Sequence, residues 1–216
     1  MPTNSCSHLV AGLHSRGKLP HLKKEGGEYF LTFRLADTLP AEVLRRFKAE
    51  REQLIAQAQA QKRPLTWREQ EEVFRWYCAR VDGYLDAGRG ECWLRQPIIA
   101  DLVANALQFF LGQRYELSAW VVMPNHVHAV VLPLAPHTLS DIEHSWKSFT
   151  ATKANQMLHR TGRTFWQPEC FDHLIRHEDD HHRCCEYVVR NPVTAGLCAR
   201  PEDWPWSSAQ VKAGSS

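Results

Sequence analysis

Two histidines separated by one residue, His126 and His128, occur in the stretch MPNHVHAVVLP between two apolar runs. On a β-strand, residues two apart project to the same face, so both imidazoles would point the same way. Together they could bind one divalent cation and leave positions open for water and a substrate, as metal-assisted chemistry at a phosphate requires. The alternative is that they cap polar edges of an apolar sheet, which is common for an isolated His-x-His pair.

A tyrosine and an asparagine four residues apart, Tyr187 and Asn191, lie in a stretch that begins EDDHH, with three carboxylates suited to the first turn of a helix. Residues four apart share a helix face, roughly 6 Å apart along the axis. A metal held by Asn191 and the two histidines could hold a phosphate within reach of the Tyr187 hydroxyl, whose attack would give a phosphotyrosine. Taken alone, Tyr187 is more typical of a core tyrosine, and Asn191 before Pro192 of a helix terminator.

The strands that must position the histidines are indicated by apolar alternation. GGEYFLTFRLAD predicts a strand at 28–35 after a glycine turn. YELSAWVVMPNHVHAVVLPL divides at Met123-Pro124-Asn125, because proline cannot donate to a ladder and Pro-Asn favours a turn. It therefore predicts two antiparallel strands joined tightly, and FWQPECFDHLIRH is expected to form an irregular strand.

Apolar residues at helical spacing predict the helices around these strands. Two helices are expected between residues 40 and 92, the second ending at the stretch GRG, and they look like a helical hairpin. A third helix is expected to open at Pro97. A fourth is expected where Ser140 precedes Glu143 by three residues, the spacing of a capping box.

This order of elements favours an α+β fold, with a ferredoxin-like sandwich as the leading arrangement: an antiparallel sheet with helices on one face, plus a helical insertion. At 216 residues the chain is long enough for one domain with a full core. We expect a flexible basic arm at 1–26, one domain at 27–209 with the helical insertion at about 40–92, and a disordered tail at 210–216.

Charge and cysteine content narrow the class of protein only partly. Lysine and arginine total 26 against 24 acidic residues, and this formal charge of +2 neither requires nor excludes a nucleic-acid partner. The seven cysteines are odd in number and lack a spaced framework, which fits reduced thiols better than secreted disulfides. No apolar run approaches the roughly 20 residues that cross a bilayer. We therefore expect a cytoplasmic protein without a membrane partner.

Four motifs, MPNHVHAVVLP, FWQPECFDHLIRHEDD, EYVVRNPVTAGL and PEDWPWSSA, occur in this order. With these intervals they resemble the single-tyrosine HUH transposases of the IS200-like family, and most closely the REP-associated tyrosine transposases of bacteria. The resemblance extends over the strand at 28–35 and most of 93–209, so that 40–92 looks like an insertion relative to compact members. Four ordered motifs are far more specific than an isolated His-x-His pair.

The resemblance implies which residues would do the chemistry. His126 and His128 match the metal-binding histidines, Tyr187 matches the nucleophile, and Asn191 matches the polar third ligand one turn later. The cofactor would be Mg²⁺ or Mn²⁺, which polarises the scissile phosphate. Family members cleave and rejoin single-stranded DNA beside small imperfect hairpins, through a 5′-phosphotyrosine and a free 3′-hydroxyl.

The resemblance also implies partners and a place in the cell. REP-type relatives act on repetitive extragenic palindromes, so single-stranded DNA hairpins are the expected partner. We expect a monomer rather than a homodimer, associated with the nucleoid when bound to DNA. Phosphate contacts are expected from basic residues of the arm and of the later helices. These candidates are Lys23, Lys24, Lys147, Lys153 and Arg176.

Several features are open to more than one interpretation. Trp146, Phe149 or Trp166 could stack an unpaired base, although core packing is favoured for each. The insertion at 40–92 could widen the DNA interface, provide a dimer surface or simply enlarge the fold. His177 and His181 are four apart and could bind a soft metal, although a solvated helix start is favoured.

Three functions compete on this sequence. The first is a metal-dependent tyrosine DNA transposase, an endonuclease and ligase specific for the sequence or structure of its DNA. The second is a domesticated, non-cleaving protein that still binds DNA hairpins. The third is an unrelated metal-binding or RNA-binding ferredoxin-like module with a chance His-x-His pair. The intact set His126, His128, Tyr187 and Asn191 favours the first.

Overall fold

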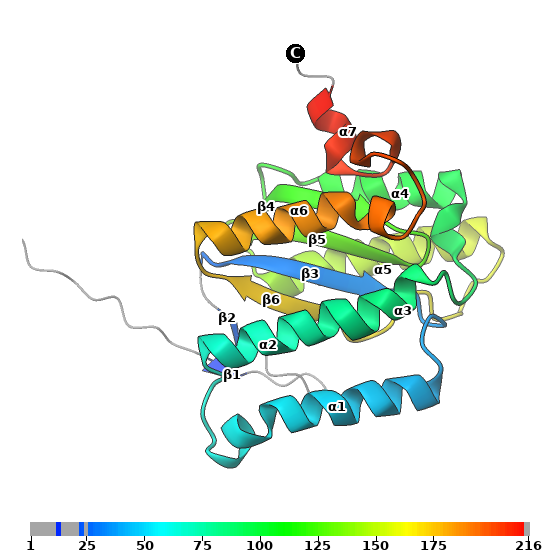
Figure 1. Cartoon of the computed structure of the whole chain (residues 1–216). Coiled ribbons are helices and arrows are strands. Elements are labelled where there is room, and N and C mark those ends of the chain that lie inside the picture. Colours follow the sequence, from blue (N-terminus) through cyan, green and yellow to red (C-terminus); the bar gives the residue numbers. More distant parts are fainter. Residues whose placement is uncertain (1–11, 14–21, 24–25, 214–216) are drawn as a thin grey trace, which may run out of the picture.

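A computed structural model of the chain describes residues 12–13, 22–23 and 26–213 (Figure 1). One sheet contains β3 (Glu28–Arg34), β4 (Tyr115–Val122), β5 (His126–Pro133) and β6 (Phe171–Ile175). The helices are α1 (Ala41–Ala60), α2 (Trp67–Tyr77), the π-helical turn η1 (Cys78–Asp82), α3 (Gly83–Asp86), the 3₁₀ turn η2 (Trp93–Arg95), α4 (Pro97–Gln108), α5 (Leu139–Met157), α6 (Glu178–Thr194), the 3₁₀ turn η3 (Pro201–Asp203) and α7 (Ser208–Ala213). The predicted strands and helices are therefore present in the predicted order.

The sheet has the order β4-β5-β3-β6, and every neighbouring pair is antiparallel. The chain enters at β3, crosses through α4 to the β4–β5 hairpin, and returns through α5 to β6, which is the ferredoxin-like arrangement. The predicted α+β class is confirmed. Strand β5, which carries the two histidines, lies between β4 and β3, so it is hydrogen-bonded on both edges.

The two faces of the sheet are covered by different helices. Alternate residues of β3 point to opposite faces, and both sets are apolar: Leu31 and Phe33 pack with α4 and α5, whereas Phe30 packs with α6 and the helices of 41–86. Figure 1 shows α4 and α5 behind the sheet and α6 in front of it. The expectation of helices on one face is therefore corrected, because each face has apolar side chains that must be buried.

The predicted helical stretch at 40–92 packs on the α6 side of the sheet. Phe74 of α2 meets Phe30 edge-on, with ring centroids 5.2 Å apart. Tyr77 stacks on Phe171 of β6 at 3.7 Å. Helix α1 lies outside α2 and is joined to it by the Trp76 indole, which donates to a carboxylate of α1. The stretch thus forms a second layer over the sheet.

The start of one helix differs in detail from expectation. The capping box of α5 uses Thr138 and Asp141, and the predicted pair Ser140 and Glu143 lies inside the helix. Both pairs have the same spacing, and the helix begins at Leu139, two residues earlier than an N-cap at Ser140 would place it. Helix α6 continues past Pro192 to Thr194, because the helix tolerates the missing donor within its last turn.

The predicted arm and tail are tested only in part. Within 1–26, the short strands β1 (Gly12–Leu13) and β2 (Leu22–Lys23) pair antiparallel, and the other residues up to 25 lie outside the described residues. Helix α7 (Ser208–Ala213) extends into the segment 210–216, whose last three residues lie outside the described residues, and the tail stays a prediction. No described helix has the length and apolar character that crossing a bilayer requires. The six cysteines among the described residues form no disulfide bond with one another.

Candidate functional site

The imidazoles of His126 and His128 converge on one point beneath α6. Both side chains are fully buried, and their Nε2 atoms lie 3.0 Å apart. The outer nitrogen of each ring is held by a neighbour: Nδ1 of His126 lies 2.7 Å from the Asn125 side-chain oxygen, and Nδ1 of His128 lies 2.7 Å from the Thr32 hydroxyl. Because the Asn125 oxygen can only accept, Nδ1 of His126 carries the proton and its Nε2 presents a lone pair.

Burial keeps both imidazoles neutral. It lowers the pKa of His126 to about 3 and the pKa of His128 well below its ordinary value, where the neighbouring histidine acts in the same direction. A metal binds the neutral form of histidine, so neither ring has to lose a proton near neutral pH. The two side chains project to the same face, as predicted, and their Nε2 atoms lie 3.0 Å apart, close enough for both to bind one cation.

Helix α6 brings the predicted tyrosine and asparagine to the same point. Asn191 is 2% exposed and lies beside His126, and its side-chain oxygen has no hydrogen-bond partner among the described residues. Tyr187 lies one turn earlier, with its ring edge-on to His128 at 5.6 Å between centroids. All four residues predicted from the sequence are thus brought together, although they come from a strand and a helix that are far apart in the chain.

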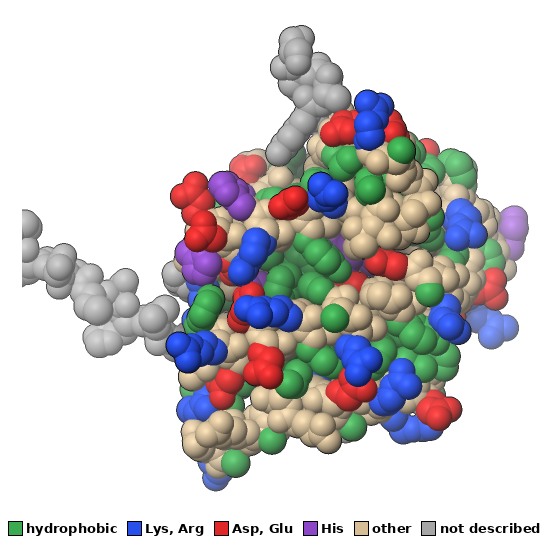
Figure 2. Space-filling view, viewed as in Figure 1, with side chains coloured by type: hydrophobic (Ala, Val, Ile, Leu, Met, Phe, Trp, Pro, Cys, Tyr) green, Lys and Arg blue, Asp and Glu red, His purple; other side chains and the backbone are tan. Residues whose placement is uncertain are grey.

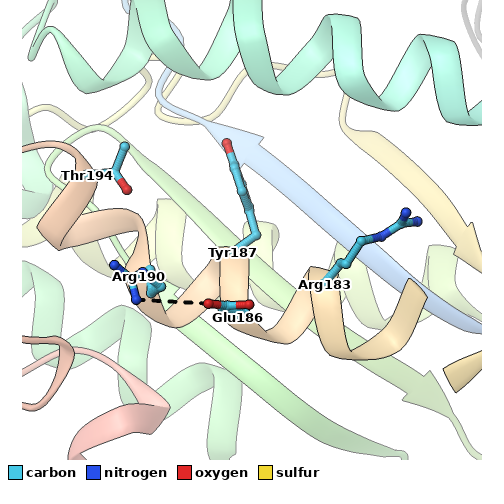
Figure 3. Close-up of a pocket in the computed structure, with 5 residues that line it drawn as sticks. All are labelled: Arg183, Glu186, Tyr187, Arg190 and Thr194. Carbon is cyan, nitrogen blue, oxygen red and sulfur yellow. Dashed lines mark ion pairs between the residues drawn. The ribbon is translucent and has the colours of Figure 1, made fainter. Parts of the chain in front are cut away.

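The Tyr187 hydroxyl donates a hydrogen bond of 2.6 Å to Asp82, which is fully buried. Burial and, next, the charge of Asp82 raise the pKa of Tyr187 far above its usual value, so the hydroxyl keeps its proton at neutral pH. The ring lines a cavity of about 290 Å³ together with Arg183, Glu186, Arg190 and Thr194 (Figure 3). Figure 3 shows Tyr187 projecting from α6 toward the helices of 41–86.

Two carboxylates of the helical stretch lie at this site and were not predicted. Asp82, at the end of η1, has Oδ2 3.8 Å from Nε2 of His128, and Asp86, at the end of α3, has Oδ1 3.9 Å from Nε2 of His126. Burial raises the pKa of Asp86 to about 7 and that of Asp82 well above its ordinary value. The available signal was a pair of aspartates four apart in VDGYLD, beside the buried apolar positions Val81 and Leu85.

The residues present fit a bound divalent cation. The Nε2 atoms of both histidines and the Asn191 oxygen, which has no partner among the described residues, lie together in a buried part of the site. A buried acceptor without a donor is costly, and a cation is the partner that imidazole nitrogens and an amide oxygen have in common. His126, His128 and Asn191 are therefore able to hold the ion that the sequence resemblance implied.

No family model matches the chain. Over 95 residues it is 32% identical to a REP-associated tyrosine transposase of Escherichia coli (strain K12), a match that covers 44% of this chain and 54% of that protein. The chain thus spans about half the length of the curated relative that it matches. The solved structure of a REP-associated tyrosine transposase bound to a REP hairpin is similar at a TM-score of 0.54 and 17% identity, and the match covers 92% of this chain and 86% of that one. The resemblance seen in the motifs is confirmed.

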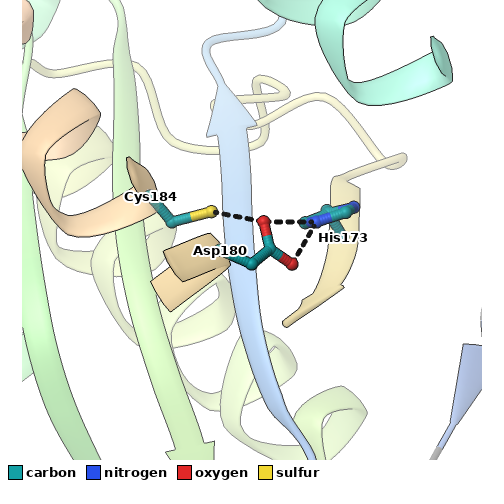
Figure 4. Close-up of side chains that lie close together, drawn as sticks. All are labelled: His173, Asp180 and Cys184. Carbon is teal, nitrogen blue, oxygen red and sulfur yellow. Dashed lines mark hydrogen bonds and ion pairs between the residues drawn. The ribbon is translucent and has the colours of Figure 1, made fainter. Parts of the chain in front are cut away.

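The structural likeness to this REP-associated tyrosine transposase establishes the shared fold, which is the scaffold that carries α6 over β5. Helix α6 is anchored at its start by a buried cluster of His173, Asp180 and Cys184 (Figure 4). The three could hold a metal ion, but their polar atoms already have partners: Asp180 accepts from His173 at 3.1 Å and from Arg183 at 3.0 Å. The cluster therefore joins α6 to β6.

The predicted histidine pair on α6 is not brought together as a metal site. His177 caps the helix by accepting from the backbone N–H of Asp180. His181 instead lies 3.5 Å from Glu28 and 3.5 Å from the sulfur of Cys185. The favoured interpretation, a helix start near solvent, agrees with this geometry.

The predicted DNA contacts are spread over the molecule. Lys147 and Lys153 lie on α5, on the opposite face of the sheet from Tyr187, and Lys147 is engaged with Glu143 and with the carbonyl of Pro168. Arg176 is exposed, and it donates to a glutamine of α2. Lys24 and the side chain of Lys23 lie outside the described residues. Whether any of these residues contacts DNA stays a prediction.

Two arginines that the sequence reading did not select lie beside the nucleophile candidate. Arg183 and Arg190 line the cavity next to Tyr187, and their side chains are 48% and 60% exposed. Figure 2 shows this face, where hydrophobic side chains gather in the strip between α6 and α2 with basic and acidic side chains around it. The signal was their spacing of four residues before and three after Tyr187, which puts them near the same helix face.

Of the three aromatic candidates for base stacking, two are buried and one is exposed. Trp146 and Trp166 are buried in the core between the sheet and α5, as favoured. Phe149 is 50% exposed and remains available to a ligand.

Proposed function

We propose that this protein is a metal-dependent, single-stranded DNA transesterase of the transposase type, which cleaves and rejoins DNA beside small palindromic hairpins. The observation that carries the proposal is the convergence of Tyr187 with two neutral, buried histidines, next to an open cavity that the Tyr187 ring lines. A tyrosine that only packs in the core would not line an open cavity, as Tyr187 does. Histidines that only cap the edge of a sheet would not bring their Nε2 atoms to within 3.0 Å of each other. Both features suit a nucleophile next to a cation.

In the proposed reaction Tyr187 attacks the phosphorus of a DNA strand that enters through the cavity. A bond forms between the tyrosine oxygen and phosphorus, and the bond from phosphorus to the 3′-oxygen breaks. Tyr187 gives up its hydroxyl proton to Asp82, its hydrogen-bond partner, and the leaving 3′-oxygen takes up one proton from water, which leaves a 5′-phosphotyrosine and a 3′-hydroxyl. The reverse attack by a 3′-hydroxyl rejoins the strand, because the phosphodiester energy is conserved in the intermediate.

The other residues would position the phosphate. His126, His128 and Asn191 would hold Mg²⁺ or Mn²⁺, which when bound polarises the phosphate and stabilises its charge. Arg183 and Arg190 would bind backbone phosphates at the mouth of the cavity, since both are charged and largely exposed. Asp82 accepts the Tyr187 proton in a hydrogen bond and so fixes the direction of the attacking oxygen.

The substrate class is proposed from the relative that was solved with a REP hairpin. We propose hairpins formed by palindromic repeats of the host genome as the target, in the cytoplasm and in association with the nucleoid. We propose a monomer, and the close approach of Tyr187 and Asn191 to the histidines of the same chain supports this.

The test is formation of a covalent adduct. The purified full-length protein is incubated with single-stranded hairpin oligonucleotides from palindromic repeats flanking its gene, with Mn²⁺ or with EDTA, and resolved under denaturing conditions. We expect an adduct that requires Mn²⁺, is lost in Tyr187→Phe, and is retained in Tyr84→Phe, a half-buried tyrosine of α3 outside the site. Tight hairpin binding without an adduct, across metals and oligonucleotides, would instead establish a non-cleaving binder.

A further inference from the structure

The helical stretch at 40–92 had three open roles: a wider DNA interface, a dimer surface or a larger fold. The geometry points to a fourth role: we propose that it contributes Asp82 and Asp86 as ligands of the metal ion held by His126 and His128. The inference rests on the proposed function, since it concerns the same ion. It turns a site of two histidines and one asparagine into a site with two additional carboxylates.

The distances are those of atoms that share one ion. Ligands about 2.1 Å from an octahedral cation lie about 3 Å from their neighbours and about 4 Å from the opposite ligand. The two Nε2 atoms are 3.0 Å apart, and the carboxylate oxygens of Asp82 and Asp86 lie 3.8 and 3.9 Å from the histidine nitrogens that they face. Each carboxylate is too far from its histidine for a direct hydrogen bond, yet close enough to bind the same cation.

The carboxylates also have buried atoms without a partner. The Oδ1 atoms of Asp82 and Asp86 are both buried and accept no hydrogen bond in the described structure. Asp82 is fully buried, and its only hydrogen bond in the described part of the chain comes from the neutral Tyr187 hydroxyl. A buried carboxylate is costly unless it is paired or binds a metal.

Protein cations do not supply that pairing. No lysine or arginine among the described residues forms an ion pair with Asp82 or Asp86. Arg34 acts on Asp82 only through space. Two carboxylates facing two neutral histidines carry a formal charge of −2 when ionised, which a divalent cation neutralises.

The helix that carries the carboxylates is fixed to the histidine strand. The Asn125 side chain donates to the carbonyls of Leu85 and Arg89 while its oxygen holds His126. Asp82 and Asp86 lie at the two ends of the short helical stretch that includes Leu85. The Asn125 side chain therefore fixes the position of this stretch relative to the His126 ring. This is the arrangement of a built site, and a peripheral DNA-binding extension would not need it.

The carboxylates have consequences for the ion and for the nucleophile. Aspartate oxygens favour hard cations such as Mg²⁺ and Mn²⁺ over the softer ions that imidazole alone would accept. The Asp82 oxygen that lies 3.8 Å from Nε2 of His128, Oδ2, also accepts the hydrogen bond from the Tyr187 hydroxyl, so one carboxylate would contact both the ion and the nucleophile. The position of Tyr187 would therefore depend on the ligand shell of the metal.

The experiment measures Mn²⁺ binding to the metal-free full-length protein by calorimetry, together with thermal unfolding in Mn²⁺ and in EDTA. The variants are Asp82→Asn, Asp86→Asn and His126→Ala, and the matched control is Glu72→Gln, an exposed carboxylate of α2 in the same helical stretch. We expect Asp82→Asn and Asp86→Asn each to weaken Mn²⁺ binding by about tenfold or more, since affinity follows the number of charged ligands. Glu72→Gln should bind as the unchanged protein does.

Thermal unfolding separates a metal-binding role of the two aspartates from a purely structural one. Asparagine keeps the shape of aspartate and removes a buried charge, so the melting temperature in EDTA should be unchanged or higher, while the increase caused by Mn²⁺ becomes smaller. If the Asp variants bind Mn²⁺ like the unchanged protein while His126→Ala does not, the inference is overturned and the proposed metal site stands. If the unchanged protein binds no Mn²⁺, both are overturned.

Discussion

The anchor of α6 offers a quantitative test, because the nucleophile candidate depends on where that helix lies. Asp180 has no exposed surface, and both of its oxygens lie within 3.3 Å of Nε2 of His173 (Figure 4). Arg183 donates to the same carboxylate. Although burial acts to raise the pKa of Asp180, these partners lower it to about 2. Asp180→Asn should therefore destabilise the protein and weaken the contact between α6 and β6.

The size of the effect follows from this pKa. A fall from 3.8 to about 2 is equivalent to about 2.4 kcal/mol of stability at neutral pH. Solvent screens part of it, because the side chain of Arg183 is 48% exposed, so we expect a loss of about 1 to 2 kcal/mol. Since the pKa is lower in the folded state, the stabilisation is complete above about pH 4 and is lost as the pH falls to about 2.

The assay is urea unfolding at pH 7, 4 and 3, with Asp179→Asn as control because Asp179 is exposed in the same helical turn. The control removes the same charge from the helix start but breaks no described buried contact, so its loss should stay near the few tenths of a kcal/mol typical of a helix-dipole effect. The difference between the unchanged protein and Asp180→Asn should shrink on acidification. An equal loss in both variants, or a difference that does not change with pH, would refute the ion-pair argument.

Three further outcomes follow from the described contacts. Gly90→Ala should lower the free energy of unfolding by about 1 to 2 kcal/mol, because φ is +85° and the new Cβ would lie 3.1 Å from the Asp37 carbonyl. Gly83 is helical and faces open space, so Gly83→Ala should raise the free energy of unfolding by about 0.5 to 1 kcal/mol. Equal effects of the two substitutions in thermal unfolding would contradict this. Lys147→Ala should lower stability by about 1 kcal/mol, and the exposed Lys153→Ala by less than about 0.5 kcal/mol, in the same assay. Mn²⁺ at about 100 times its Kd should raise the free energy of unfolding by about 2.7 kcal/mol, and EDTA should abolish the rise; no rise would argue against a metal site.

The parts of the fold that could be predicted from the sequence are those set by local pattern. The β4–β5 hairpin follows from two alternating runs on either side of Pro124-Asn125, and it puts His128 opposite Val121. A strict two-residue period decides which face each histidine takes. The four-residue spacing on α6 decides in the same way that Tyr187 and Asn191 lie on one face.

The carboxylates at the site could not be predicted, for a geometric reason. Residues 78–82 form a π-helical turn, which adds a residue to the helical repeat and rotates every later side chain relative to α2. A period of 3.6 carried forward from Phe74 and Tyr77 therefore misplaces Asp82 and Asp86. The sequence alone also does not reveal that Asn125, read as a turn residue, fixes this helix to β5.

The place of the helical stretch at 40–92 in the chain explains why a segment so far from the histidines in sequence reaches them. Strand β3 ends at Arg34, which pairs with His126, and the next residue, Leu35, donates its backbone N–H to the carbonyl of Asn125. The chain returns at Leu94, whose N–H donates to the carbonyl of Pro124. Both ends of the segment are thus tied to the turn that precedes His126. A helical pair placed there must fold over one face of the sheet next to that turn, and the face with α6 is the one on which Phe30 and Phe171 need cover. The same apolar burial that stabilises the segment therefore carries its aspartates to the histidines.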